Sequence, residues 1–200
     1  TGFDPSWRYF LNVVNGTDLK FGRDIYFTYG PLGYLFYLMK LPGNTIEYWS
    51  GIVIWGIIFL FHLWMLLQLY RLYQKGKIHF WAITASVCCY LAGYYAPTRD
   101  NYLLYLMILA VVLWAKGAKN IVLIPNLLLL LMFFGKFSTF TSGFAFCILF
   151  CIFDVLFRKN WKSIWLFLPG IILMPVCYLV YCPSIKNLFE YVAGILKISS

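Results

Sequence analysis

The sequence predicts an all-α protein, a polytopic bundle of transmembrane helices preceded by a long polar segment. Of its 200 residues, 62% are hydrophobic and only 12% are charged, whereas a soluble domain is typically about half apolar and a quarter charged. Aromatic residues make up 22% of the chain, which is typical of membrane proteins because Trp and Tyr collect at bilayer interfaces. The net charge of +9 is spread in small clusters between apolar runs. It therefore indicates membrane orientation and not a nucleic-acid partner.

Residues 1–50 form the polar segment and are expected to carry two short amphipathic helices. Pro5 predicts the start of the first helix, because Pro is favoured at the first helical position. Its apolar face would hold Trp7, Phe10, Leu11 and Val14. The second helix would start at Pro31, end at Pro42–Gly43, and present Leu32, Leu35, Phe36 and Met39. Helices with one apolar face are expected to lie in the membrane interface.

Residues 51–182 form the predicted bundle. A spanning helix needs about 20 apolar residues, and six runs qualify or come close: 51–70, 80–96, 102–115, 121–134, 139–157 and 163–181. The third and fourth runs are short, so they are expected to extend into their flanks or to form a shallow hairpin. Residues 183–200 are expected to form an amphipathic tail or the start of a further segment.

The loops between the runs predict the orientation. The loops after the first, third and fifth runs carry eight basic residues and no acidic one: Arg71, Lys75, Lys77, Lys116, Lys119, Arg158, Lys159 and Lys162. Short cytoplasmic loops are enriched in Lys and Arg. Residues 1–50, the loops 97–101 and 135–138, and the tail are therefore predicted to be non-cytoplasmic.

Three polar groups fall on this non-cytoplasmic side. They are Asp4 with Arg23–Asp24, the pair Arg99–Asp100, and Lys136. Lys and Arg contact phosphate oxygens, and a carboxylate can hold a divalent metal or take a proton from an attacking hydroxyl. These residues thus suit a lipid-linked phosphate at a bilayer surface. Solvated polar turns have a similar composition, so that simpler interpretation stays open.

The other titratable residues give weaker signals. The six cysteines lie within apolar runs or at the end of one, without a His nearby, and packing is their expected role. His62, inside a run, and His79, at the edge of one, stand isolated in the sequence. Neither is predicted to be catalytic.

Four short motifs resemble those of the GT-C superfamily of membrane glycosyltransferases. Phe3-Asp4-Pro5-Ser6-Trp7-Arg8-Tyr9 is similar to the first outer loop of oligosaccharyltransferase catalytic subunits, and residues 23–33 resemble a stretch of uncharacterised bacterial members. Thr98-Arg99-Asp100-Asn101 resembles a loop of protein O-mannosyltransferases and lipid A aminoarabinose transferases. Leu131-Met132-Phe133-Phe134-Gly135-Lys136 resembles a helix end where those enzymes carry Leu-Thr-Lys-Gly, although Phe134-Gly135 and Phe137 flank Lys136 here.

The resemblance implies transfer of a sugar from a polyprenyl-phosphate donor to a lipid, glycan or protein acceptor, at the outer face of the bacterial cytoplasmic membrane. The chain would be the N-terminal part of such an enzyme, inactive alone. Asp4 would be the general base or would position a divalent metal, Mg or Mn, with Asp24 and Asp100 assisting. The donor-binding residues would be Arg8, Arg23, Tyr29, Arg99 and Lys136.

Two other classes of function stay open. One is a transporter or flippase for lipid-linked sugars, which is disfavoured because such proteins usually place charged residues within their spans. The other is a membrane scaffold subunit without enzymatic activity, in which residues 1–50 would be a docking surface.

Overall fold

The computed structural model of the chain describes residues 6–14, 17–21, 23–25, 29–95, 99–181 and 184–199. Within these ranges it is helical, without β-strands, as the sequence predicts. The elements in order are α1 (Ser6–Val13), η2 (Gly33–Phe36), α2 (Thr45–Gln74), α3 (Phe80–Tyr95), α4 (Arg99–Ala115), η3 (Lys119–Ile121), α5 (Leu123–Gly135), α6 (Phe137–Arg158), η4 (Trp161–Leu166), α7 (Leu168–Tyr181) and α8 (Ile185–Ser199). A few helical side chains, among them those of Arg99 and Asp100, lie outside the description.

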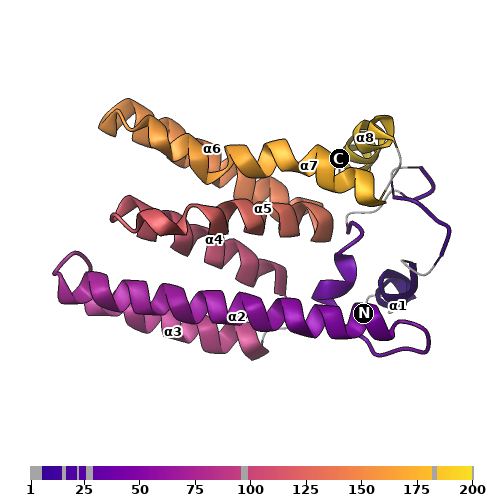
Figure 1. The fold of residues 1–200 in the computed structure, drawn as a ribbon, viewed down its shortest axis with the longest axis horizontal. Coiled ribbons are helices and arrows are strands. Elements are labelled where there is room, and N and C mark those ends of the chain that lie inside the picture. The colour runs from indigo at the N-terminus through magenta and orange to yellow at the C-terminus, as the bar shows by residue number, and fades with distance from the viewer. Residues whose placement is uncertain are drawn as a thin grey trace.

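The helices α2 to α7 lie alongside one another, and α1 and α8 both lie at one end of the bundle, α1 beside η2 and α8 beside α7 (Figure 1). A helix lies at each of the six apolar runs. Three segments are long and apolar enough to cross a membrane: Thr45–Gln74, Phe137–Arg158 and Trp161–Val180. They indicate a membrane-associated protein.

The helices α3, α4 and α5 are shorter, with 16, 17 and 13 residues. At 1.5 Å per residue they are about 24, 26 and 20 Å long, against a hydrocarbon core of about 30 Å. Figure 1 shows that the α3–α4 pair ends short of the N-terminus of α2. The start of α4, where Arg99 and Asp100 lie, is thus recessed from the end of the bundle that carries α1.

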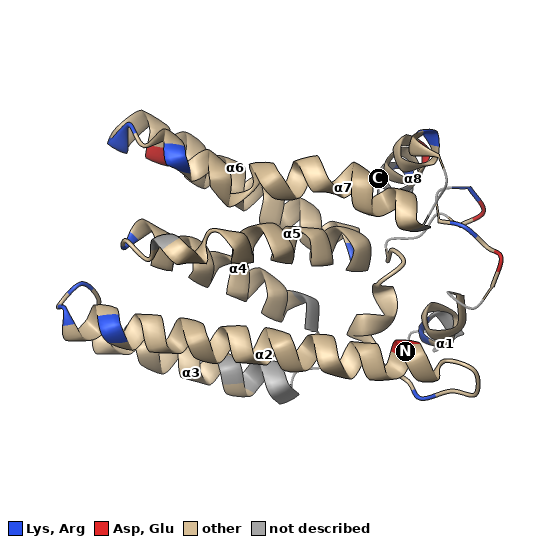
Figure 2. Cartoon of the chain, viewed as in Figure 1, with Lys and Arg blue, Asp and Glu red and all other residues tan. Residues whose placement is uncertain are grey.

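Charged residues gather at the two ends of the bundle, and the middle is almost free of them (Figure 2). The turns after α2, α4 and α6 bring their basic residues to one end. The described residues between 17 and 40, the α5–α6 junction and α8 lie at the other. This separation agrees with the alternation of basic loops in the sequence.

The centre of the bundle is α5, which packs against α4, α6 and α7. Its side chains Leu129 and Met132 are completely buried. The outward faces of α2, α6 and α7 instead expose apolar side chains such as Leu60, Leu149 and Val180. An apolar surface of this extent marks contact with a membrane or another protein.

A polar cluster joins α2, α3 and α4 inside the bundle. The buried His62 ring lies 2.6 Å from the Tyr102 hydroxyl through Nδ1 and 3.2 Å from Ser86 Oγ through Nε2. Ser86 Oγ lies in turn 2.5 Å from the Tyr105 hydroxyl. His62, isolated in sequence, therefore has partners on two other helices, and the cluster fixes how these three helices meet.

The prediction of a second amphipathic helix from Pro31 onward is wrong in the length of the helix and in its surface position. The chain forms there the four-residue 3₁₀ helix η2, and all four of its residues are buried. The Trp55 indole N–H donates a 2.7 Å hydrogen bond to the Leu35 carbonyl. This contact and the burial of Leu35 and Phe36 in the core hold the segment against α2, so it does not lie as an amphipathic helix on the surface. The first expected helix is present as α1.

Candidate functional site

The segment Tyr29–Gly33 is attached to the junction between α5 and α6. The Gly30 amide donates to the Gly135 carbonyl at 3.0 Å, and the Leu32 amide donates to the Phe134 carbonyl at 2.8 Å. Lys136 is the one residue between the two helices and has an extended backbone. It pairs with Tyr29 in an antiparallel bridge. A stretch of the N-terminal segment is thereby fixed to the turn that carries Lys136.

Two glycines allow this close attachment. A Cβ atom on Gly30 would lie 2.6 Å from the Phe134 carbonyl oxygen and 2.9 Å from the Tyr191 hydroxyl. A Cβ atom on Gly135 would overlap the Phe36 ring. Glycine has no side chain and permits such backbone approach, so the contact depends on both positions.

Three of the predicted donor-binding residues belong to one series of contacts at this attachment. The Lys136 ammonium lies 5.3 Å from the centroid of the Tyr29 ring, and the Arg8 guanidinium carbon lies 4.8 Å from that of Tyr37. The hydroxyls of Tyr29 and Tyr37 are 3.3 Å apart. Aromatic faces attract cations, and the two tyrosines thus gather two positive charges at the end of the bundle.

The Asp24 carboxylate is held by hydrogen bonds within its own turn. The Asp24 carboxylate accepts hydrogen bonds from Arg23 Nη2 at 2.7 Å and from the Lys20 amide at 2.9 Å. These bonds, that of Arg23 first, hold the pKa of Asp24 below its usual range. Among the described residues, all contacts of Asp24 lie in this turn. They favour a structural role for Asp24, and its catalytic role stays a prediction.

The remaining predicted site residues lie outside the description. Asp4 falls outside the described residues, and with it the predicted divalent metal. Arg99 and Asp100 begin α4, but the description does not extend to their side chains. Their predicted roles stay predictions.

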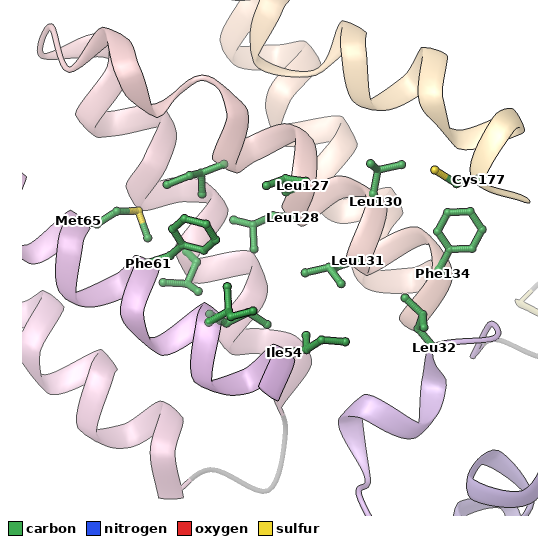
Figure 3. Close-up of a pocket in the computed structure, with 14 residues that line it drawn as sticks. Leu32, Ile54, Phe61, Met65, Leu127, Leu128, Leu130, Leu131, Phe134 and Cys177 are labelled. Atoms are coloured by element: carbon green, nitrogen blue, oxygen red, sulfur yellow. The ribbon is translucent and has the colours of Figure 1, made fainter. Parts of the chain in front are cut away.

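An apolar groove of about 370 Å³ runs between α2 and α5. Figure 3 shows Ile54, Phe61 and Met65 of α2 facing Leu127, Leu128 and Leu131 of α5 across it. All of its lining residues are apolar: Leu32, Ile54, Ile57, Ile58, Phe61, Met65, Leu106, Ile124, Leu127, Leu128, Leu130, Leu131, Phe134 and Cys177. Leu32 and Phe134, joined by the hydrogen bond described above, close one end of the groove. Lys136 follows Phe134 by two residues.

A second cavity, of about 380 Å³, lies beyond Leu32 and has a mixed lining. Its polar residues are Thr17, Lys20, Tyr34, Glu47 and Ser50, and Leu32 lines both cavities. Glu47, Ser50 and Ile54 follow one another on a single face of α2, because residues three or four apart on a helix share a face. Val180 in the second cavity and Cys177 in the groove are related in the same way on α7. The two cavities are therefore stacked along α2 and α7, on either side of Leu32.

The polar cavity holds an ordered set of hydrogen-bonding groups. Ser50 Oγ donates to the Glu47 carbonyl at 2.9 Å, so its single proton is used there and the Tyr34 hydroxyl, 3.2 Å away, donates to it. Burial raises the pKa of Tyr34, and the negative charge of Glu47 raises it further. Tyr34 thus stays protonated near neutral pH, in a cavity that Glu47 and Lys20 also line.

Lys20, Tyr34 and Glu47 were not among the site residues predicted from the sequence. The sequence signal that could have indicated the two cavities was the spacing of Glu47, Ser50 and Ile54. It places an acid, a hydroxyl and an apolar residue on one face of a helix. That signal depends on α2 starting at Thr45, six residues before the predicted span. Comparison of the chain with protein-family models, curated proteins and solved structures gave no match.

Proposed function

We propose that the chain is the donor-binding part of a membrane glycosyltransferase that takes a sugar from a polyprenyl-phosphate donor. The observation that carries the proposal is the meeting of the apolar groove and the polar cavity at Leu32. A polyprenyl-phosphate sugar has the same two parts, a long apolar chain and a charged, hydroxylated head. The groove suits the chain, and the cavity suits the head.

In this proposal α2 to α7 cross the bacterial cytoplasmic membrane as six spans, and the polar cavity faces its outer side. The basic turns after α2, α4 and α6 would face the cytoplasm, in agreement with the usual bias of Lys and Arg. The shorter helices would be accommodated by local thinning of the bilayer, which costs only fractions of a kcal/mol per Å.

Two acidic and two basic residues then have roles in the transfer. The acceptor oxygen forms a bond to the anomeric carbon of the sugar while the bond from that carbon to the donor phosphate oxygen breaks. A carboxylate takes the acceptor proton, and Asp4 or Glu47 fills this role. Lys136, with Lys20 in the cavity, stabilises the negative charge of the departing polyprenyl phosphate.

The test uses the full-length protein in membrane vesicles with radiolabelled polyprenyl-phosphate sugars. Leu131→Trp fills the groove, and Leu123→Trp is its control, because Leu123 is exposed on the same helix and does not line the groove. We expect Leu131→Trp to raise the donor KM at least tenfold with kcat less affected, and Leu123→Trp to match the wild type.

The carboxylates are tested in the same assay with Asp4→Asn and Glu47→Gln. Loss of the base is expected to lower kcat by about 10²-fold or more, so the variant with the lower kcat identifies it. Absence of transfer by the wild-type protein with every donor would reject the glycosyltransferase proposal. Movement of labelled lipid across the vesicle without transfer would then identify a flippase, and absence of both would favour a scaffold subunit.

A further inference from the structure

A third cavity, of about 740 Å³, lies at the basic end of the bundle, opposite the candidate site. It is enclosed by the C-terminal ends of α4 and α6 and by η4. Trp114 and Trp165 line it together with Asp154, Arg158 and Lys162. No part of the proposed transfer reaction uses these residues.

The wall of this cavity is built around a buried carboxylate. The Asp154 side chain is only 1% exposed, and Asn160 Nδ2 donates a 2.8 Å hydrogen bond to its Oδ2. Lys159 has a left-handed backbone with φ of 52°, which turns the chain back so that the Asn160 amide caps the Asp154 carbonyl at 3.2 Å. Ser163 Oγ donates to the Asn160 carbonyl at 2.8 Å and fixes the next turn.

The surface that this wall presents to the cavity is cationic. The Arg158 side chain is 54% exposed, although its Nη1 lies 3.5 Å from the Asp154 carboxylate, and Lys162 is exposed. Of the described residues that line the cavity, Asp154 is the acidic one, and it is buried behind Arg158 and Asn160. A ligand in the cavity would therefore meet two positive charges before it met the negative one.

The surroundings of the cavity are apolar. Phe157, next to Arg158 in the chain, and Trp161 and Trp165, in η4 with Lys162, are all exposed. Tryptophan is enriched at the membrane interface, where head groups meet hydrocarbon. Aromatic side chains beside a cationic cavity suit a molecule with a negative head and apolar chains.

We infer that this cavity binds the head group of an anionic phospholipid, with Arg158 and Lys162 on the phosphate and the exposed Trp165 ring against the acyl chains. Basic pockets between transmembrane helices are a known means of recognising such head groups. The inference is independent of the proposed transfer reaction, because it concerns the other end of the bundle.

The experiment titrates the purified protein in detergent with phosphatidylglycerol, with phosphatidylcholine and with soluble glycerol phosphate. Bound lipid is counted by native mass spectrometry, and the apparent Tm is followed by Trp fluorescence. Lys162→Glu reverses one charge in the cavity. Lys75→Glu is the control, because it changes the net charge equally at an exposed position of the same end that does not line the cavity.

We expect phosphatidylglycerol alone to bind and to raise the apparent Tm. Lys162→Glu should weaken this binding at least tenfold, and Lys75→Glu should leave it unchanged. Both variants should have the wild-type Tm without lipid, because both side chains are exposed. Equal binding of phosphatidylcholine, equal effects of the two variants, or binding of glycerol phosphate as tightly as the lipid would each overturn the inference.

Discussion

Replacement of Gly30 by alanine tests the attachment of the N-terminal segment to the α5–α6 junction. The new Cβ atom would lie 2.6 Å from the Phe134 carbonyl oxygen. That oxygen belongs to the last turn of α5 and already accepts the hydrogen bond from the Leu32 amide. Because it is a backbone atom, it cannot rotate away as a side chain would, and the segment itself must move.

The magnitude follows from the contacts that this movement disturbs. Overpacking a well-packed site costs about 1–3 kcal/mol. The movement also lengthens the hydrogen bonds of the Gly30 and Leu32 amides, each of which contributes about 0.5–1.5 kcal/mol. These costs overlap. Alanine restricts the unfolded chain and restores about 0.4–1 kcal/mol, which leaves a net loss of about 1–2 kcal/mol. For 200 residues this lowers the Tm by about 2–8 °C.

The assay is thermal unfolding of the purified protein in detergent, followed by Trp fluorescence at one heating rate. Gly56→Ala is the control, because Gly56 lies within α2 and a Cβ atom there would meet open space. It is expected to keep or raise the Tm, since alanine is the better helix former by about 1 kcal/mol. Equal Tm values for Gly30→Ala and Gly56→Ala would refute the close attachment described above.

Three further predictions concern charged or polar side chains. The hydrogen bond from Arg23 lowers the folded-state pKa of Asp24, so the turn is fully stabilised above the unfolded pKa of Asp24 and loses this stabilisation as the pH falls through the folded one. The protection factors of the turn amides in hydrogen exchange should therefore fall as Asp24 is protonated, and Asp24→Asn should abolish this pH dependence. His62→Leu leaves the buried Tyr102 hydroxyl without this partner and should cost about 1 kcal/mol in thermal unfolding, less than additively with Tyr102→Phe. Lys136→Met should lower the rate of sugar transfer at least tenfold, whereas Lys136→Arg should retain most of it. Equal transfer rates for the two variants would show that donor binding does not depend on the positive charge of Lys136.

The positions of the helices followed well from hydropathy, but their ends did not. The run 139–157 corresponds to α6, which spans Phe137–Arg158. The run 51–70 corresponds to α2, which is longer at both ends, because polar residues such as Glu47 and Arg71 continue the helix without adding to its hydropathy. The expected helix at Pro31 was wrong because periodicity shows that a segment has an apolar face and not what covers that face.

The contacts of the site could not be predicted from the sequence, because they join residues that are far apart in the chain. His62 and Tyr102 are 40 residues apart, and Tyr29 and Lys136 meet only because separate elements pack together. Lys136 was selected for its chemistry and Tyr29 through the resemblance, but their contact was not foreseen. Glu47 and Lys20 became candidates only through the cavity that they share, and a cavity exists only in the packed chain.

The shortness of α5 has a consequence for the biosynthesis of the protein. A 13-residue helix, about 20 Å long, does not bridge a hydrocarbon core of about 30 Å by itself. Since Lys136 alone separates it from the 22-residue α6, the two helices would enter the membrane as one hairpin in the proposed topology. The partners that enclose α5 come from both sides of it in the chain, α4 before and α7 after. The most buried helix is therefore fully covered only after α7 has left the ribosome.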